Sequence, residues 1–231
     1  KHSHTAQRGD RVLNARFVRE SRTLARLAHP GVLAVLDCGE DDGSRYLILE
    51  YLDGPTLEQK VESRGPLPVA EAVHLQHQLL DALASVHEAQ VLHRDVKPAN
   101  MLLVPGRGVV LIDFGICRTM LDSQALTESG VMVGTPAFLA PEVIQGGAAD
   151  PASDLYSAEL VLHYMLTGEA TFRRPKVFAS LQAQVDEAPA ALERGPRALR
   201  ALLASWLDKD PRRRPGTGAR GFQSELQRAS A

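Results

Sequence analysis

Three short stretches of the sequence carry residue types that could do chemistry. HRDVKPAN, residues 93–100, contains Asp95 and Asn100, while DFG begins at Asp113 and GTPAFLAPE begins at Gly134. Carboxylate and amide oxygens are the ligands that hard cations prefer, and a carboxylate can also accept a proton in catalysis. The alternative is that these side chains only cap loops, as most loop Asp and Asn residues do. The order and spacing of the stretches decide between the two interpretations.

In that order, the three stretches resemble the motifs of protein kinases, most closely those of the eukaryotic-like serine/threonine kinases of bacteria. DFG by itself is a weak signal, but His-Arg-Asp-x-Lys-x-x-Asn followed by Asp-Phe-Gly fixes eight positions. The resemblance covers essentially all 231 residues. It implies that the protein phosphorylates Ser and Thr hydroxyls of protein substrates at the expense of ATP.

The resemblance assigns catalytic roles within the first two motifs. Asp95 matches the base that orients the attacking hydroxyl and accepts its proton, and Lys97 matches the residue that reaches the transferred phosphate. Asn100 and Asp113 match the side chains that hold Mg²⁺, or Mn²⁺, against the phosphates of ATP. Lys97 and Thr135 favour Ser/Thr substrates over Tyr substrates.

The resemblance also implies where ATP would bind. A lysine–glutamate pair would grip the phosphates, the backbone of a hinge would bond adenine, and two leucines would line the back and the floor of the pocket. The matching residues are Lys1 and Glu20 for the pair, Glu50 and Leu52 for the hinge, Leu49 for the back of the pocket and Leu102 for its floor.

Other matches are structural. Glu142 and Arg214 resemble the buried ion pair that braces the C-terminal lobe, and Asp154 resembles the helix residue that anchors the catalytic loop. The alternative for these three residues is ordinary surface charge. An apolar column that links the two lobes of kinases is matched by Leu24, Val35, His93 and Phe114.

Regulation by phosphorylation is a further expectation. Arg94, beside the catalytic Asp, is typical of kinases that are switched by a phosphate on the activation loop. Thr127 and Ser129 lie where bacterial relatives carry phosphorylated residues, and Thr135 belongs to the same segment. We therefore expect trans-autophosphorylation, with self-association of the kinase; the alternative is ordinary polar loop composition.

The elements that must position these residues are expected to form an α+β, protein-kinase-like two-lobe fold. Residues 1–52 are expected to form a partial N-lobe with a helix and two strands, and residues 53–231 a mainly helical C-lobe, with a break near Asp53-Gly54-Pro55. Periodicity and turn residues predict helices over 10–28, 68–89, 153–167, 175–186, 196–208 and 218–229, strands over 32–38 and 46–51, a short helix after Pro55, and short strands between 91 and 115.

The chain departs from the family pattern in two places. Glu159 occupies a helix position where relatives usually have Gly, and EATF follows Gly168 in place of the usual xPPF. Neither change touches the phosphate chemistry. Both bear on the packing of the C-lobe and on the docking of substrates.

A Gly-rich phosphate loop does not occur in the sequence, and Lys1 lies 19 residues before Glu20, the separation usual in bacterial relatives. We expect that the chain begins at the phosphate-gripping lysine, that a longer protein is the active kinase, and that this stretch alone is poorly active. Two alternatives stay open: a pseudokinase that serves as a scaffold or binding module, and a kinase of small molecules. The presence of Asp95, Asn100 and Asp113 disfavours the first, and GTPAFLAPE disfavours the second.

Composition excludes several other classes of protein. The net charge is -2 and aromatic residues make up 5%, which disfavours a nucleic-acid-binding protein. The two cysteines, Cys38 and Cys117, are far apart and suggest reduced thiols in the cytoplasm. The apolar runs are too short for a membrane segment within these residues. We therefore expect a cytoplasmic domain, and these residues give no information on an anchor elsewhere.

Overall fold

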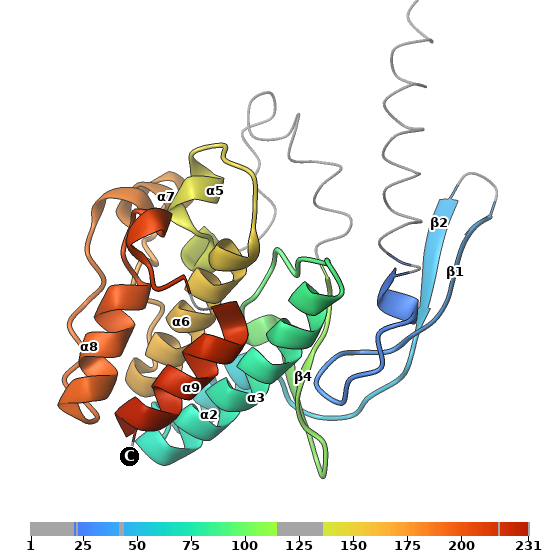
Figure 1. Ribbon diagram of the computed structural model, residues 1–231, viewed down its shortest axis with the longest axis horizontal. Coiled ribbons are helices and arrows are strands. Elements are labelled where there is room, and N and C mark those ends of the chain that lie inside the picture. Colours follow the sequence, from blue (N-terminus) through green and yellow to red (C-terminus); the bar gives the residue numbers. More distant parts are fainter. Residues whose placement is uncertain (1–20, 22, 42–43, 115–135, 217, 231) are drawn as a thin grey trace, which may run out of the picture.

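The computed structural model describes residues 21, 23–41, 44–114, 136–216 and 218–230. A hairpin of two strands lies to one side of a helical body (Figure 1). The elements, labelled as in Figure 1, are β1 (Val35–Asp41), β2 (Ser44–Leu49), α2 (Leu57–Arg64), α3 (Val69–Glu88), η1 (Pro98–Asn100), β3 (Met101–Val104), β4 (Gly108–Leu111), η3 (Pro136–Phe138), α5 (Pro141–Ile144), α6 (Pro151–Thr167), α7 (Val177–Asp186), α8 (Arg197–Trp206), η4 (Pro211–Arg213) and α9 (Gly218–Ser230).

Helix α6 runs through the middle of the helical body. Every residue from Ser153 to Leu166 is buried, which is typical of a helix surrounded by other elements rather than one with a single apolar stripe. Asp150 caps its first turn in a reciprocal pair with Ser153, and Gly168 ends it with a φ of 79°. The helical body is therefore built around a helix whose two ends are fixed by local sequence.

Helix α3 packs against both α6 and α9. Its residues Leu79, Leu80 and Leu83 are fully buried. Helices α8 and α9 pack on each other, and the rings of Trp206 and Phe222 lie 3.9 Å apart between them. Helices α3, α8 and α9 thus shield α6 from solvent.

The β3–β4 hairpin joins the helical body to the N-terminal part. The N–H of Leu111 donates to the carbonyl of Gly31 at 2.9 Å, and the N–H of Leu33 donates to the carbonyl of Leu111 at 3.0 Å. On the other strand, the N–H of Leu103 donates to the carbonyl of Pro55 at 2.9 Å. The segments that lead into β1 and out of β2 are therefore both tied to this hairpin.

The predicted α+β fold class, with a small N-terminal part and a mainly helical body, is confirmed. The helix predicted over 10–28 lies mostly outside the described residues, although residues 21 and 23–25 are helical. The strands extend further into the polar stretch 39–44 than predicted, because backbone pairing continues from Gly39 opposite Tyr46 to the end of the hairpin. Helix α5 was not predicted, since four residues are too few to show a period.

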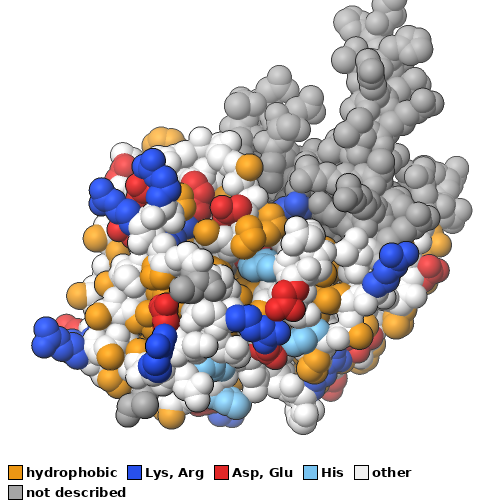
Figure 2. Space-filling view, in the orientation of Figure 1, with side chains coloured by type: hydrophobic (Ala, Val, Ile, Leu, Met, Phe, Trp, Pro, Cys, Tyr) orange, Lys and Arg blue, Asp and Glu red, His pale blue; other side chains and the backbone are white. Residues whose placement is uncertain are grey.

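The surface of the helical body carries both signs of charge. Lys and Arg side chains are interspersed with Asp and Glu on the face shown in Figure 2. Among the helices of the described residues, none combines the length and the apolar character needed to cross a membrane.

Glu159 is completely buried on α6 against α3. Its Oε1 accepts a hydrogen bond from Gln76 Nε2 at 3.1 Å, and the same amide nitrogen donates to the carbonyl of Ala158 at 3.0 Å. Within the described part of the chain, Glu159 Oε2 and Gln76 Oε1 have no hydrogen-bond partner. Burial raises the pKa of Glu159 well above its ordinary value, against a smaller lowering by the Gln76 hydrogen bond. The core therefore holds Glu159 as a neutral acid.

Replacing Glu159 by Gln is expected to stabilise the protein increasingly as the pH rises from about 5 to about 7. The unfolded chain releases this proton above the ordinary pKa of 4.5, whereas the folded state retains it, so the free energy of unfolding of the wild type falls with rising pH in this window. Chemical denaturation at several pH values measures the difference, with the exposed Glu193→Gln as control. A difference between Glu159→Gln and wild type that does not change with pH contradicts the interpretation.

Candidate active site

The HRDVKPAN stretch forms the loop between α3 and β3. The chain leaves α3 through Gln90, which has a φ of 59°, and Arg94 has a φ of 63°. Both are left-handed conformations, which are unfavourable for residues other than glycine. Pro98 then begins η1, and Asn100 ends it. A loop that contains such unfavourable conformations needs contacts with other parts of the fold to hold it in place.

The support is the carboxylate of Asp154 in the first turn of α6. Its Oδ2 accepts a hydrogen bond from the backbone N–H of His93 at 2.9 Å and lies 2.9 Å from Nε2 of His87, and its Oδ1 accepts one from the N–H of Arg94 at 2.8 Å. Burial by itself would raise the pKa of Asp154, but the hydrogen bond and charge of His87, together with His93, outweigh it and lower the pKa. The buried carboxylate stays ionised and holds two successive amides of the loop.

Asp95 lies between Lys97 and Asn100. Lys97 Nζ donates to Asp95 Oδ2 at 2.7 Å, and Asn100 Nδ2 donates to the same oxygen at 2.8 Å and to the Asp95 carbonyl at 2.9 Å. The Asp95 side chain is 10% exposed, and the residue lines a small pocket together with Arg94 and Val96. Two donors on the same loop therefore fix the position of the carboxylate at the edge of this pocket.

Asp113 follows β4 and lies next to the loop. The N–H of Ile112 donates to the carbonyl of Asn100 at 3.0 Å, and Nε2 of His93 lies 3.2 Å from the carbonyl oxygen of Ile112. Asp113 comes directly after, exposed and with a left-handed φ of 55°. The pairing of Ile112 with Asn100 thus brings the two predicted metal ligands to neighbouring positions.

The oxygens of Asn100 and Asp113 suit a hard cation. Asn100 Nδ2 donates to two oxygens of Asp95, and Asn100 Oδ1 is left with no hydrogen-bond partner among the described residues. Mg²⁺ is usually bound by one or two protein side chains together with phosphates and water. No group of three or more His, Cys, Asp or Glu in the described parts of the chain is arranged to hold a metal. A cation held by Asn100 and Asp113 would take its remaining ligands from phosphates or water.

His93 connects the loop to the DFG segment. Its ring is fully buried, and its centroid lies 4.6 Å from that of Phe114. Burial lowers the pKa of His93, although Asp154 and Asp95 act in the opposite direction. Leu24 is buried, and Val35 and Phe114 pack against the core. The four residues expected to form an apolar column thus lie in the core or against it.

Arg107, in the turn between β3 and β4, holds the predicted hinge. Its Nη1 donates to Glu50 Oε2 at 2.8 Å, its Nη2 donates to Glu50 Oε1 at 3.0 Å, and its Nε donates to the carbonyl of Pro30 at 2.6 Å. The N–H of Ala34 donates to Glu50 Oε1 at 2.7 Å. The hydrogen bond from Arg107 lowers the pKa of Glu50 against an opposing effect of burial. Arg107 therefore fixes the segment predicted to be the hinge through the side chain of Glu50.

Only some of the other residues predicted to bind ATP or to regulate activity lie among the described residues. Leu49 is 41% exposed, and Leu52 and Leu102 are half-buried, with Leu102 paired to Val110 and bridged to Thr56. Leu102 therefore lies beside the chain that leaves the hinge. The predicted residues that lie outside the described residues are Lys1, Glu20, Thr127, Ser129 and Thr135.

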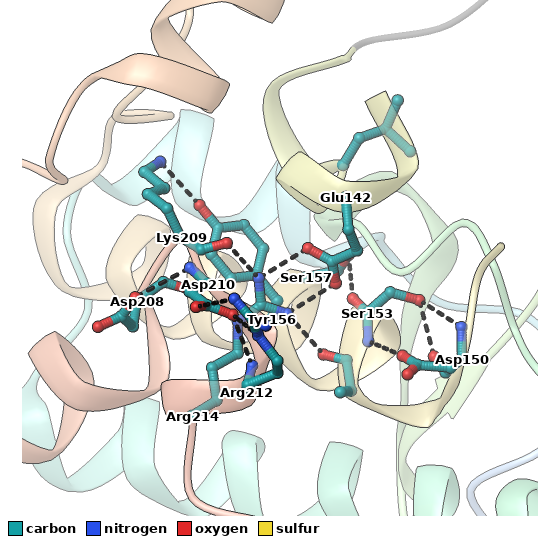
Figure 3. Close-up of polar contacts among 12 residues, drawn as sticks. Glu142, Asp150, Ser153, Tyr156, Ser157, Asp208, Lys209, Asp210, Arg212 and Arg214 are labelled. Carbon is teal, nitrogen blue, oxygen red and sulfur yellow. Dashed lines mark hydrogen bonds and ion pairs between the residues drawn. The ribbon is translucent and has the colours of Figure 1, made fainter. Parts of the chain in front are cut away.

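Glu142 and Arg214 form a bidentate ion pair between α5 and the loop after η4 (Figure 3). Arg214 Nη1 and Nη2 donate to Glu142 Oε1 and Oε2, both at 2.7 Å, and Arg214 Nε donates to the carbonyl of Asp208 at 2.8 Å. The guanidinium carbon lies 4.5 Å from the centroid of the Tyr156 ring on α6. The Arg214 side chain is 2% exposed. The pair ties the end of the GTPAFLAPE segment to the central helix.

Sequence reasoning missed Arg107 and Lys209. Lys209 Nζ lies 3.8 Å from the centroid of the Phe172 ring and donates to Tyr156 Oη at 3.0 Å. Burial, followed by the charge of Arg214, lowers the pKa of Lys209 to about 8. Arg107 stands in a Gly-rich turn and Lys209 in a run of charges, and both settings are typical of solvated residues. No sequence signal distinguishes these two cations from surface charge.

The loop presents Asp, Lys and Asn, is anchored to a buried helix and is followed by Asp-Phe-Gly. Together these features define the catalytic region of the protein kinase class. The family model described as "Protein kinase domain" matches residues 1–225. The chain belongs to the protein kinase family.

Its relatives include bacterial serine/threonine kinases, as the resemblance predicted. The chain is 34% identical to "Serine/threonine-protein kinase pkn3" of Myxococcus xanthus over an alignment of 238 positions, which covers 97% of the chain and 43% of that protein. It is 35% identical to "Serine/threonine-protein kinase PknL" of Mycobacterium tuberculosis, with 88% and 52% covered. It is 32% identical to "Serine/threonine-protein kinase PrkC" of Bacillus subtilis, with 93% and 33% covered. The chain spans about half of these relatives, or less.

Breaking the Glu142–Arg214 pair is expected to destabilise the protein strongly. Glu142→Gln and Arg214→Met should each lower the free energy of unfolding by about 3 kcal/mol, because each leaves the partner charge largely buried and unpaired. The double variant should lose clearly less than the sum of the two. Denaturant unfolding in a double-mutant cycle measures this coupling. The more exposed Asp81–Arg220 pair is the matched control, and equal coupling in both cycles contradicts the assignment.

Proposed function

We propose that the protein transfers the γ-phosphoryl group of ATP to Ser and Thr hydroxyls of protein substrates. The observation that carries this proposal is the Asp95 carboxylate, which Lys97 and Asn100 hold on a loop anchored by Asp154 and placed beside Asp113. Family membership and the bacterial serine/threonine kinase relatives support it.

The side chains of the site have different roles in phosphoryl transfer. Asp95 orients the attacking hydroxyl and accepts its proton, and Lys97, 2.7 Å from Asp95, offers positive charge to the phosphoryl oxygens as charge develops on them. Asn100 and Asp113 would hold Mg²⁺ or Mn²⁺. These two side chains would thereby place the positive charge of the ion, when it is bound, against the negative charge of the phosphates. The anchored loop holds these groups in the positions that the reaction needs before the substrate binds.

The nucleotide would bind next to the hinge. The backbone of residues 50–52 would bond adenine, with Leu49 and Leu102 against the base, and Arg107 keeps this segment in place through Glu50. Lys1 and Glu20 would grip the α- and β-phosphates. We also propose that a phosphate on Thr127 or Ser129 pairs with Arg94, which would order the activation segment around Thr135.

Asp95→Asn in the full-length protein is expected to lower kcat about 10²–10⁴-fold, because an amide cannot accept the proton of the attacking hydroxyl. Transfer of labelled phosphate from ATP to a Ser/Thr peptide library measures kcat, and mass spectrometry of the same samples reports phosphate on Thr127 and Ser129. Asp186→Asn, at the exposed end of α7, is the matched control. Activity of Asp95→Asn within threefold of wild type rules out the proposed role of Asp95.

A further inference from the structure

Helix α7 is joined by one side chain to the small pocket that contains Asp95. Phe138 and Leu139, at the end of η3, line this pocket, and we call them the pocket wall. Gln184, in the last turn of α7, is completely buried, and its Nε2 donates a hydrogen bond to the carbonyl of Leu139. Between described residues, no other hydrogen bond joins 137–140 to a segment distant in the sequence. The position of the pocket wall therefore depends on where α7 places Gln184.

Lys209 in turn holds the turn of α7 that carries Gln184. Its Nζ donates to the backbone carbonyl of Gln184 at 2.6 Å and to Tyr156 Oη on α6 at 3.0 Å, and the second of these bonds is drawn in Figure 3. Carbonyls in the last turn of a helix have no partner within the helix and carry partial negative charge, which an ammonium group neutralises. Lys209 therefore fixes the end of α7 to α6, the same helix whose Asp154 holds the catalytic loop.

The burial of both side chains lowers the stability of the fold. Gln184 Oε1 is buried and has no hydrogen-bond partner among the described residues, and burial lowers the pKa of the half-buried Lys209. An unsatisfied buried oxygen and a partly desolvated ammonium group are both unfavourable. Proteins retain such departures from ideal packing mainly at functional sites. Stabilisation of the core therefore does not account for these two residues, whereas the placement of Leu139 does.

We propose that Gln184 and Lys209 are positioning residues for phosphoryl transfer, which act through the Leu139 carbonyl and set the pocket wall beside which the phosphoacceptor segment must lie. This inference rests on the proposed kinase function. Leu139 and Asp95 line the same small pocket, so a segment whose hydroxyl reaches the Asp95 carboxylate passes Leu139. In the described residues, the hydrogen bonds of Gln184 and Lys209 reach neither the hinge nor the two predicted metal ligands. The two residues should therefore affect the protein substrate and not ATP.

The test uses the full-length protein and a Ser/Thr peptide that the wild type selects from a library. Gln184→Met keeps the approximate size of the side chain and removes its donor. The variant loses one hydrogen bond but also one unsatisfied oxygen, and because these effects on stability oppose each other it should fold. KM for the peptide is expected to rise roughly tenfold, while KM for ATP stays within about twofold of wild type. Gln182→Met, at an exposed position of the same helix, is the matched control and should keep both KM values.

A second variant tests whether Lys209 acts through the same carbonyl. Lys209→Met removes the donor to Tyr156 and Gln184 and keeps an apolar side chain against Phe172. It should raise KM for the peptide and leave KM for ATP unchanged. If both residues act through Leu139, the double variant Gln184→Met/Lys209→Met raises the peptide KM by clearly less than the product of the two single effects. Single effects that multiply overturn the inference.

An unchanged peptide KM in Gln184→Met overturns the inference and leaves the kinase function intact. The same holds for a parallel loss with peptide and ATP together with a lower free energy of unfolding, which would show that Gln184 only stabilises the fold. If the wild type phosphorylates no peptide, the kinase function fails, and amide hydrogen exchange then decides whether Gln184 positions the pocket wall. Exchange in residues 138–140 should be roughly tenfold faster in Gln184→Met than in wild type, with α9 unchanged. Equal exchange in the two proteins overturns the inference.

Discussion

The catalytic geometry depends on one buried carboxylate, that of Asp154. It accepts hydrogen bonds from the backbone N–H groups of His93 and Arg94, and Arg94, directly before Asp95, has an unfavourable left-handed φ of 63°. Without this acceptor, one buried and one partly buried N–H group would lose their partner and the strained turn would relax. The position of Asp95, and with it the shape of the small pocket that Asp95 lines, follows from a charge on the first turn of α6.

Helix α6 carries two buried acids that their surroundings place in opposite states. Asp154 has two amides and His87 as partners, and its pKa is lowered in spite of burial. Among the described residues, the Glu159 side chain has only Gln76 as a hydrogen-bond partner, and burial raises its pKa. The pKa values of the two acids shift in opposite directions because Asp154 has more hydrogen-bond donors and a nearby imidazole, not because the two residues are buried to different depths. The same helix therefore positions the loop with an ionised acid and packs on α3 with a neutral one. Arg214 stacks on Tyr156 of this helix as well and links it to Glu142, at the end of the GTPAFLAPE stretch.

The sequence predicted what depends on local pattern and on motif spacing. The long helices of the body, the hairpin and the neighbourhood of Asp95, Lys97 and Asn100 belong to this group, since the HRDVKPAN loop is contiguous. What could not be predicted depends on contacts between distant segments that no family motif marks. Arg107 reaches Glu50 across 57 positions of the chain, and Lys209 donates to Tyr156 across 53 positions. Neither leaves a periodic or compositional trace.

Amide hydrogen exchange of His93 and Arg94 in Asp154→Asn tests the central claim most directly. The amide side chain keeps the size of the carboxylate, but an NH2 donor replaces one of the two oxygens that accept from His93 and Arg94. One N–H group therefore loses its acceptor, and the acceptor of the other loses its charge. The account predicts exchange at these two amides at least roughly tenfold faster than in wild type, with α9 amides unchanged and kcat lowered. Unchanged exchange at His93 and Arg94, or equal acceleration throughout the chain, would show that the loop is held by something other than Asp154.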